Sequence, residues 1–319
     1  MKTLAVAALL GAAAIYAPNA YAADIDWAAV PGKDVTLFYP GQTSWEYILT
    51  PTKHEGAPRF KGGKNCVECH TGEEDLLGKK LVTGKINEPT PIPDKPGFLP
   101  ANIKFAHDAT TLYVHLEFAD GGQPDAKMDP KYETKVTMML NQGTLPEAVR
   151  AGCWGGCHED LATMPAADGA ERTMYTAGTR AKMSAQGGGD ALKPEADLTK
   201  LRAEGKTFEY WQARLNAGAP AVAVDGTIFD KRVENPTPAV TAEATLAGGK
   251  WSVTLSRKLK AGAPYKDLEA GHTYTVGFAI HAGHTARRFH YVSMARTFVV
   301  DQQNLVADKV PADFTAAGK

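Results

Sequence analysis

Alternation of apolar and polar residues is the main pattern along the chain from residue 101 onward, and it predicts β-strands. The stretch IKFAHDATTLYVHLEFAD contains two alternating runs on either side of a turn at Asp108. One face of the second run is apolar throughout, and its residues are Leu112, Val114, Leu116 and Phe118. We therefore expect two paired strands with one buried face.

The later part of the chain predicts further strands and few helices. TKVTMMLN, TFEYWQARL and HTYTVGFAIHAG are strand candidates, and PEADLTKLRAEGK predicts a short helix that ends at Gly205. Gly248–Gly249 predicts a hairpin turn in VTAEATLAGGKWSVTLSRKL, and Asp225–Gly226 predicts another in AVAVDGTIF. Several short strands with turn signals predict a mainly β protein, an antiparallel β-sandwich of the immunoglobulin-like type. The long segment between the strands, from 142 to about 192, is of a length that is usually functional.

The N-terminus predicts a secretory signal peptide over residues 1–22. One lysine precedes an apolar run, and small residues follow at Ala20 and Ala22, so cleavage is expected after Ala22. The apolar run stops at Pro18, which is too short for a membrane anchor of about 20 residues. We expect a mature chain without a membrane span, located in the periplasm.

The stretch KNCVECHTGEE predicts covalent attachment of a haem. Cys66, Cys69 and His70 form the C-x-x-C-H pattern, in which two thiols bond the porphyrin edge and the histidine is the proximal iron ligand. Zinc would need a second pair of ligands at a suitable spacing. A redox disulfide would need the cysteines at the end of a strand in a βαβ unit, whereas they lie in a loop rich in glycine and lysine.

A second, longer motif predicts a second haem. Cys153, Cys157 and His158 read C-x-x-x-C-H, with one extra residue between the cysteines. Gly155 and Gly156 can take positive φ values that let the longer loop arch away from a porphyrin, and Trp154 would shield the macrocycle. A Cys153–Cys157 disulfide is the alternative, although two glycines disfavour the helical turn that would bring the thiols together.

An iron that only transfers electrons needs a sixth ligand besides its proximal histidine, and we expect the other histidines to provide it. His54 precedes Cys66 by twelve positions across a loop rich in glycine and proline that can fold back over the first haem. His290 alternates with Val292 and Met294 on one face of ARRFHYVSMARTFVV, where iron would be a suitable buried partner. Met164 is the rival for either haem, and the remaining histidines are expected in surface or core roles; they are His107, His115, His272, His281 and His284.

The strand segments of residues 101–300 resemble the haem-binding domain of ethylbenzene dehydrogenase γ-subunits and related dimethylsulfide dehydrogenase subunits, also named cytochrome c-552 or DMSO-reductase-like domains. The matching stretches are IKFAHDATTLYVHLEFAD, TKVTMMLN, WSVTLSRKL and HTYTVGFAIHAGHTARRFHYVSM. The resemblance implies a β-sandwich that holds haem between a loop and the last core strands. The γ-subunits bind haem b through Met and Lys, whereas this chain has GCWGGCHED and His290 at those places. The resemblance thus implies the dihaem c-type branch, and a role within a molybdenum enzyme does not carry over directly.

The domain organisation that follows has three parts. Residues 1–22 form the signal peptide, residues 23–99 form an irregular segment around the first haem, and residues 100–310 form the sandwich with the second haem. Lys and Arg total 35 against 36 acidic residues, so no basic field predicts binding to nucleic acid.

We therefore predict a periplasmic cytochrome with two covalent haems c and no catalytic residue. It would carry electrons between a membrane quinol-oxidising cytochrome and a terminal reductase or oxidase. One alternative is a haem enzyme with an open iron that reduces peroxide or an oxyanion, using donors at His281, His284, Arg287 and Arg288. Another alternative is a haem subunit of a molybdoenzyme complex.

Overall fold

The protein is mainly β, as predicted. The computed structural model describes residues 25–152, 154–155, 176–182, 191–300 and 313–318. The strands are β1 (Gly32–Phe38), β2 (Phe98–His107), β3 (Thr111–Ala119), β4 (Thr134–Asn141), β5 (Phe208–Leu215), β6 (Val222–Ile228), β7 (Arg232–Glu234), β8 (Thr241–Ala247), β9 (Lys250–Lys258), β10 (Thr273–His281), β11 (Tyr291–Val292), β12 (Arg296–Val300) and β13 (Phe314–Gly318). The helices are short, and they are α1 (Trp45–Ile48), α2 (Ala57–Lys61), α3 (Cys66–His70), α4 (Glu74–Val82), α5 (Pro146–Ala151), the 3₁₀ turn η1 (Ala177–Thr179) and α7 (Glu195–Ala203).

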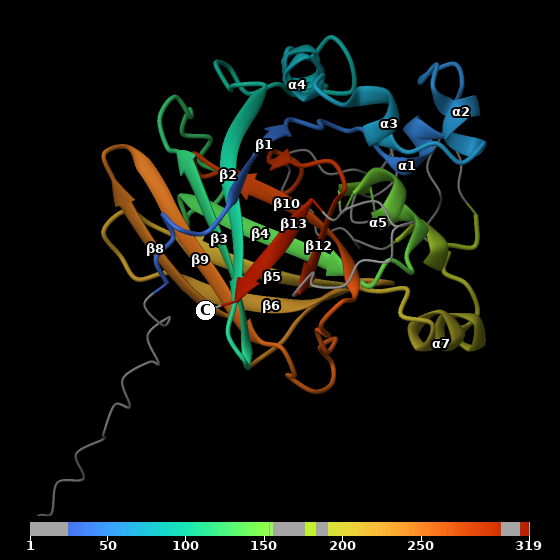
Figure 1. Cartoon of the computed structure of the whole chain (residues 1–319). Coiled ribbons are helices and arrows are strands. Elements are labelled where there is room, and N and C mark those ends of the chain that lie inside the picture. The colour runs from blue at the N-terminus through green and yellow to red at the C-terminus, as the bar shows by residue number, and fades with distance from the viewer. Residues whose placement is uncertain (1–24, 153, 156–175, 183–190, 301–312, 319) are drawn as a thin grey trace, which may run out of the picture.

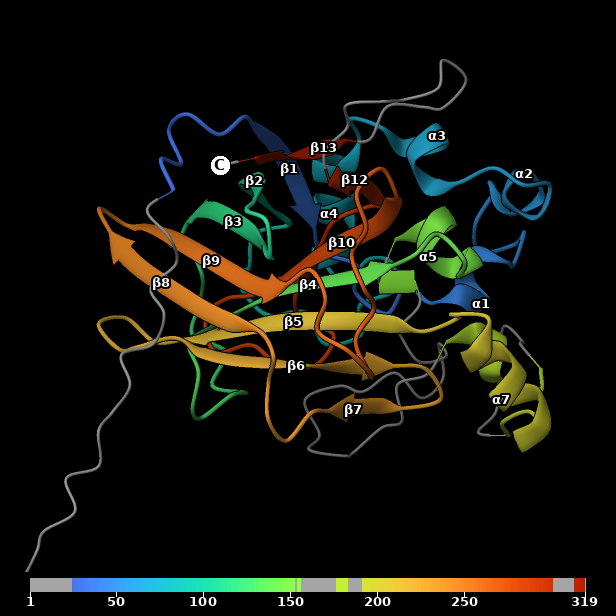
Figure 2. The ribbon, with the colours of Figure 1, turned by 60° about the horizontal axis from the view of Figure 1, so that its bottom comes forward.

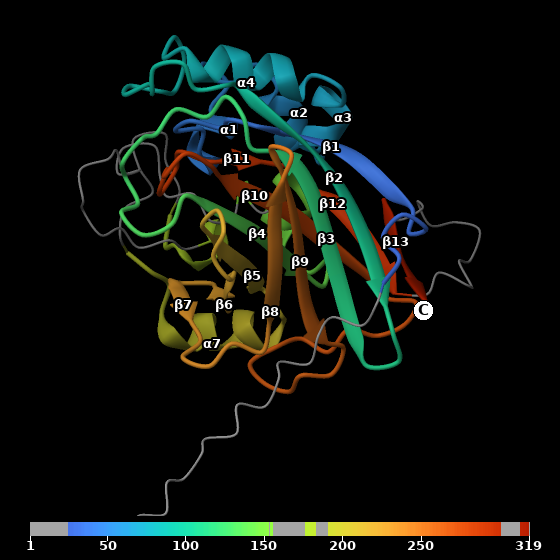
Figure 3. The same ribbon diagram turned by 90° about the vertical axis from the view of Figure 1, so that its left-hand side faces the viewer.

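The strands form a β-sandwich from one continuous sheet that folds over itself. Their order is β7-β6-β5-β4-β10-β11-β1-β2-β3-β9-β8, and β12 and β13 make a second connection between β10 and β2. Nearly all pairs are antiparallel, and the exceptions are the two pairs made by β13. The two layers enclose one large apolar core, to which both halves of the sheet contribute (Figure 3).

The predicted alternation on β3 is confirmed by this core. Leu112, Val114, Leu116 and Phe118 are all buried in it. TKVTMMLN is β4 from end to end, and the helix predicted in PEADLTKLRAEGK is α7, with its C-cap at Glu204 beside the predicted Gly205. Period-2 patterning identified β3 because its apolar face repeats every two residues, whereas β4 is buried along its whole length.

The hairpin at Gly248–Gly249 is confirmed. β8 and β9 flank the two glycines, whose φ angles are 58° and 73°. Positive φ at both central positions is what a tight two-residue turn between strands requires, and glycine adopts it without steric cost.

The turn predicted at Asp225–Gly226 is wrong, because β6 runs straight through it. Asp225 is fully buried and accepts hydrogen bonds from the Ala239 and Val240 amides at 2.7 and 2.9 Å. A Cβ on Gly226 would lie 1.9 Å from the Val233 carbonyl oxygen. Asp225 therefore provides a buried carboxylate that accepts backbone hydrogen bonds, and Gly226 allows another strand to approach closely. An Asp-Gly pair also favours turns, so the sequence alone could not distinguish these roles from a turn.

Strand β1 was not predicted. It comes from the N-terminal segment 23–99 and pairs with β2 in a register that runs from Gly32↔Lys104 to Phe38↔Phe98. Only Val35 and Leu37 of this strand point into the large core, so its apolar signal is short. The division of the chain near residue 99 stays a prediction, but one strand of the sandwich lies on its N-terminal side.

Helices α1 to α4 gather at one end of the sandwich, and α1 to α3 lie on the side opposite the β8–β9 turn (Figures 1 and 2). A second apolar cluster lies beneath them, and its buried members are Phe38, Trp45, Ile48, Phe60, Ala151, Trp154, Val292 and Met294. We call this set the cap cluster. Within the described residues, no helix is both long enough and apolar enough to span a bilayer.

Candidate haem site

The segment that carries the first predicted haem motif is helix α3. Its N-cap Asn65 forms a capping box with Glu68: the Glu68 amide donates to the Asn65 side chain and the Asn65 amide donates to the Glu68 carboxylate, each at 2.8 Å. These reciprocal bonds satisfy two amides that would otherwise lack acceptors at the helix start. A single helical turn therefore presents Cys66 and Cys69, three residues apart, on one face.

The structure brings the rings of His54 and His70 close together. Their ring centres are 6.2 Å apart, with 38° between the ring planes. The loop between them contains α2 and the α2–α3 connection, and it folds back as the glycine and proline content predicted. Cys66 and Cys69 of α3 are both free thiols in the structure.

Hydrogen bonds fix the tautomer of both rings. His54 Nδ1 lies 3.0 Å from the Ile48 carbonyl oxygen, and His70 Nδ1 lies 3.0 Å from Glu73 Oε2. A carbonyl and a carboxylate can only accept, so Nδ1 is the donor in each neutral ring. Each Nε2 is left with a lone pair, which is the form in which imidazole binds a metal.

The spacing of the two rings fits one iron between them. Two imidazoles that bind the same metal from opposite sides, with bonds of about 2 Å each, have ring centres about 6 Å apart. The observed 6.2 Å matches this value. Across the described parts of the chain, no group of three or more histidine, cysteine, aspartate or glutamate side chains is arranged to hold a metal, so the zinc alternative gains no support.

Gly56 is a residue of this site that the sequence analysis did not single out. A Cβ at this position would lie 2.9 Å from Cε1 and 3.1 Å from Nε2 of His54. Contacts of this length are shorter than carbon atoms normally tolerate. The absence of a side chain at position 56 therefore leaves room for the His54 imidazole in its observed place.

The cap cluster forms the apolar surroundings of α3. Cys66 and Val67 pack against it, and burial raises the pKa of the Cys66 thiol to about 12. Trp154 belongs to the same cluster and meets Phe38 edge to face, with ring centres 5.9 Å apart. Trp154 therefore lies in apolar surroundings directly beside the first motif. Its role in shielding a haem from water stays a prediction.

The second motif lies largely outside the described residues. Cys153, Cys157, His158 and the rival ligand Met164 cannot be placed, whereas Trp154 and Gly155 can. Helix α5, which leads into the motif, is joined to the first motif by Arg150, whose guanidinium donates to the Lys64 carbonyl at 3.0 Å and lies 4.0 Å from the Phe60 ring centre. The chain therefore enters the second motif next to the first.

The single strand predicted through ARRFHYVSMARTFVV is wrong, because the structure forms two strands, β11 and β12, and His290 lies just before β11. Val292 and Met294 belong to the cap cluster, whereas Phe289 and Tyr291 belong to the large core. His290 is 7% exposed, and His281 stacks on it with ring centres 4.7 Å apart and 22° between planes. These rings are in direct contact and leave no room for a metal between them, so His281 supports His290 and the two do not flank one iron.

His281 is held in its neutral form. Its Nε2 lies 2.8 Å from the Arg287 carbonyl oxygen, and burial, assisted by Lys135, His290 and Lys95, brings its pKa well below the usual value. A neutral ring can stack on His290 without charge repulsion. The other donors invoked for a haem enzyme are engaged: Arg288 pairs with Glu88 at 2.6 Å, and His284 pairs with Asp125 at 3.1 Å.

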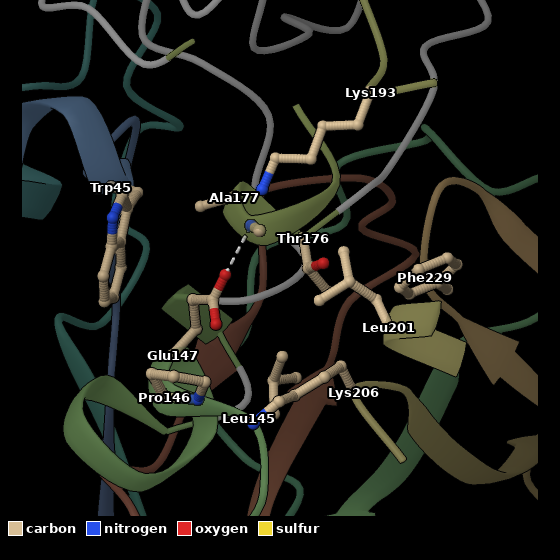
Figure 4. Close-up of a pocket in the computed structure, with 11 residues that line it drawn as sticks. Trp45, Leu145, Pro146, Glu147, Thr176, Ala177, Lys193, Leu201, Lys206 and Phe229 are labelled. Atoms are coloured by element: carbon tan, nitrogen blue, oxygen red, sulfur yellow. Dashed lines mark hydrogen bonds between the residues drawn. The ribbon is translucent and has the colours of Figure 1, made fainter. Parts of the chain in front are cut away.

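A cavity of about 330 Å³ lies on the other side of α5 (Figure 4). Trp45 and Phe229 stand on opposite sides of it, and Lys193 and Lys206 also line it (Figure 4). The Glu147 carboxylate, beside the cavity, accepts a hydrogen bond from the Gly178 amide at 2.8 Å. Among the described residues that line it, His54, His70 and His290 do not appear, so the cavity is separate from the His54–His70 pair.

The fold is a β-sandwich, and helix α3 beside it carries the C-x-x-C-H pattern of c-type haem attachment. A family model described as ethylbenzene dehydrogenase matches residues 24–293, and the chain belongs to this family.

Two relatives match most of the chain. The chain is 34% identical to cytochrome c-552 of Stutzerimonas stutzeri over 313 residues, which cover 95% of this chain and 97% of the relative. It is 30% identical to cytochrome c-551 of Rhodocyclus tenuis over 271 residues, or 84% and 92% of the two chains. Among solved structures, a putative carbohydrate-binding protein from Bacteroides uniformis covers 64% of this chain and 72% of its own, at 9% identity and a TM-score of 0.30, which is too low to carry an argument.

Membership in this family and the two cytochrome relatives establish a c-type cytochrome, with covalently bound haem c and electron transfer as its function at the family level.

Proposed function

We propose that the protein is a periplasmic dihaem cytochrome that carries electrons between a membrane quinol-oxidising cytochrome and a terminal reductase or oxidase. The observation that supports this proposal best is the pair of neighbouring imidazoles at His54 and His70, because two opposed nitrogen ligands close an iron to substrates and leave it suited to electron transfer. The secretory pattern of residues 1–22 supports the periplasmic location.

The residues of the first site would have three roles: to attach the haem, to bind its iron, and to orient the iron-binding imidazoles through hydrogen bonds. Cys66 and Cys69 would attach the haem covalently, His70 would be the proximal ligand and His54 the distal ligand. The Glu73 carboxylate and the Ile48 carbonyl orient these two rings through Nδ1. The bound haem supplies one-electron chemistry, and the protein supplies orientation and a partly apolar setting.

The second site is proposed on the sequence and on the position of His290. Cys153 and Cys157 would be the thioether anchors, His158 the proximal ligand and His290 the distal ligand. The segment 23–99 would thus hold one haem and the segment 100–310 the other. His281, stacked on His290, would keep that ring in place.

Low reduction potentials are expected from this ligand set. Methionine ligation raises the potential of a haem, whereas two histidines do not. The Glu73 carboxylate adds to the effect at the first iron, because a hydrogen bond from Nδ1 to a carboxylate makes the ligating imidazole more basic.

Carbon monoxide binding to the reduced protein tests the closed-iron proposal against an enzyme with an open iron. We expect no CO binding, together with low-spin paramagnetic resonance signals from both haems in the oxidised protein. A high-spin signal, or binding of one CO per molecule in the untreated protein, contradicts the electron-carrier proposal and favours the haem enzyme. Gel filtration of the native protein addresses the remaining alternative, since a haem subunit of a molybdoenzyme elutes as part of a large complex.

Gly56→Ala is expected to weaken the bond from His54 to iron. The added methyl group would press on the imidazole at Cε1 and Nε2, so the ring must shift by several tenths of an ångström. The measurement is the fraction of high-spin haem in the oxidised protein, which should rise from near zero to a substantial share of one haem.

Gly62→Ala is the matched control for this substitution. Gly62 ends α2 with φ −76° and ψ 4°, close to the −71° and −6° of Gly56 at the other end of the helix. Its added Cβ would meet only backbone oxygens at 3.4 Å. Equal spectra for the two variants would show that Gly56 does not position His54.

A further inference from the structure

The cavity beside α5 has the size and the apolar walls of a small-molecule site. Its volume is about 330 Å³, and Trp45 and Phe229 stand on opposite sides of it (Figure 4). Leu145 and Leu201 add further apolar walls. An enclosed apolar cavity of about 150 Å³ is enough to hold benzene, and pockets for small ligands begin at about 300 Å³. The space therefore fits a flat system of two fused rings.

A carboxylate of this cavity has unused hydrogen-bonding capacity. Glu147 lines the cavity and is 4% exposed, and its Oε1 accepts from the Gly178 amide at 2.8 Å. Among the residues that the structure describes, Oε2 has no donor and the carboxylate has no ion pair. A buried carboxylate without these partners costs free energy, so a ligand group that donates a hydrogen bond to Oε2 is favoured.

The hydroxyl of Thr176 is a second polar group without a partner. Thr176 lines the cavity and is 1% exposed, and its Oγ1 is buried with no hydrogen bond in the described part of the chain. The backbone around it is fixed, because the Thr176 amide donates to the Phe229 carbonyl at 2.7 Å. The bond from Gly178 to Glu147 holds this turn against α5, so Thr176 and Glu147 line the same space. A ligand hydroxyl suits such surroundings, since it can donate to a carboxylate and accept from a threonine.

Two lysines make the cavity positive. Lys193 and Lys206 line it and are half-buried, whereas Glu147 is buried. The Lys206 ammonium donates to the Thr144 carbonyl, and the Lys193 ammonium has no acceptor within the described ranges. Lys193 is held beside η1, since its amide donates to the Thr179 carbonyl at 2.9 Å. Two cations against one carboxylate disfavour an organic cation between the aromatic rings and favour a ligand with a negative group.

We propose that this cavity binds an aromatic hydroxy acid. Its ring system lies between Trp45 and Phe229. Its hydroxyl donates to the Glu147 carboxylate, and its own carboxylate pairs with the Lys193 ammonium. The site goes beyond the proposed electron transfer and depends on neither haem, because the described residues that line it include no proposed haem anchor or ligand.

Isothermal titration calorimetry of the purified holoprotein with 6-hydroxy-2-naphthoate tests the site. We expect a dissociation constant below about 100 μM. Naphthoate, which lacks the hydroxyl, should bind about tenfold more weakly, because it leaves the buried Glu147 carboxylate unpaired. Naphthol, which lacks the carboxylate, should bind about threefold more weakly, because Lys193 is only half-buried. Equal affinities for the three probes, or no binding of the hydroxy acid, overturn the proposal.

Two substitutions test the two ends of the ligand separately. Glu147→Gln keeps an oxygen for the Gly178 amide but loses the acceptor at Oε2, so it should weaken the hydroxy acid about tenfold without weakening naphthoate. Lys193→Met should weaken both acids about threefold and leave naphthol unchanged. Lys200→Met is the matched control, because Lys200 on α7 is exposed and is not among the described lining residues. A Glu147→Gln protein that binds all three probes as the unsubstituted protein does contradicts the proposed site.

Two further measurements complete the test. If Glu147→Gln does not fold, Thr176→Val replaces it, since valine has the shape of threonine without the hydroxyl, and it too should weaken the hydroxy acid more than naphthoate. The haem absorption spectrum, recorded during the titration, should stay unchanged. A spectrum that shows a new iron ligand overturns the proposal, because the probe then binds at an iron and not in the cavity.

Discussion

Replacing His54 by alanine is expected to open the first iron to external ligands. The reduced variant should bind one CO per molecule, whereas the unsubstituted protein should bind none, and its oxidised spectrum should gain the high-spin signal of one haem. The reason is geometric: the His54 ring lies 6.2 Å from that of His70, at the distance that one shared iron requires, and its Nε2 is the nitrogen with a free lone pair. Covalent attachment through Cys66 and Cys69 should keep the haem in place.

The matched control for this variant is His272→Ala. His272 is exposed, lies immediately before β10, and meets the Tyr274 ring edge to face with ring centres 4.6 Å apart, and it is not one of the proposed ligands. It should leave the spectra unchanged. If His54→Ala also binds no CO and stays low-spin, another side chain is the sixth ligand and the His54 assignment is wrong.

Replacing Cys153 and Cys157 together by alanine is expected to lower the mass of the mature protein by one haem. The unsubstituted chain should carry two haems, because each cysteine pair stands before a histidine in a protein of a c-type cytochrome family. The two alanines remove both thioether bonds of the second site, while the α3 site has its own cysteines and keeps its haem. Mass spectrometry of the denatured protein counts the haems directly.

The double variant Cys66→Ala and Cys69→Ala provides the comparison, since it should also lose one haem but a different one. Its remaining haem should keep the spectrum that the Cys153/Cys157 variant lacks. If the unsubstituted chain has the mass of one haem, and is lighter by two hydrogens than its reduced form, Cys153 and Cys157 form a disulfide and the second site does not exist.

Sequence patterns predicted most strands of the sandwich. The period-2 runs predicted β3 and the β8–β9 hairpin, because burial of one face leaves a repeat along the chain. TKVTMMLN was also predicted as a strand, and it is β4, which is buried along its whole length. The spacing of Cys66, Cys69 and His70 predicted a haem motif in a loop, whereas the structure forms helix α3 there. His54 as the sixth ligand stays a prediction, and the structure places its ring 6.2 Å from that of His70.

The features that the sequence did not reveal depend on contacts between distant segments. Strand β1 has only two residues in the large core, and its place is fixed by pairing with β2 across about 60 residues of chain. Asp225 and Gly226 have the composition of a turn and are used for tertiary contacts. Gly56 carries no local signal of its role, and the bond from His70 to Glu73 depends on the non-helical turn at Thr71 and Gly72 between α3 and α4.

The one-sided placement of the helices also has a practical consequence. The turn at Gly248–Gly249, between β8 and β9, lies on the left of the molecule in Figure 1, whereas α1 to α3 lie on the right. A side chain added at either glycine would meet nothing within 4 Å. A tether inserted into this turn would hold the molecule on an electrode by its strand end, with the His54–His70 side facing solution and accessible to a soluble redox protein.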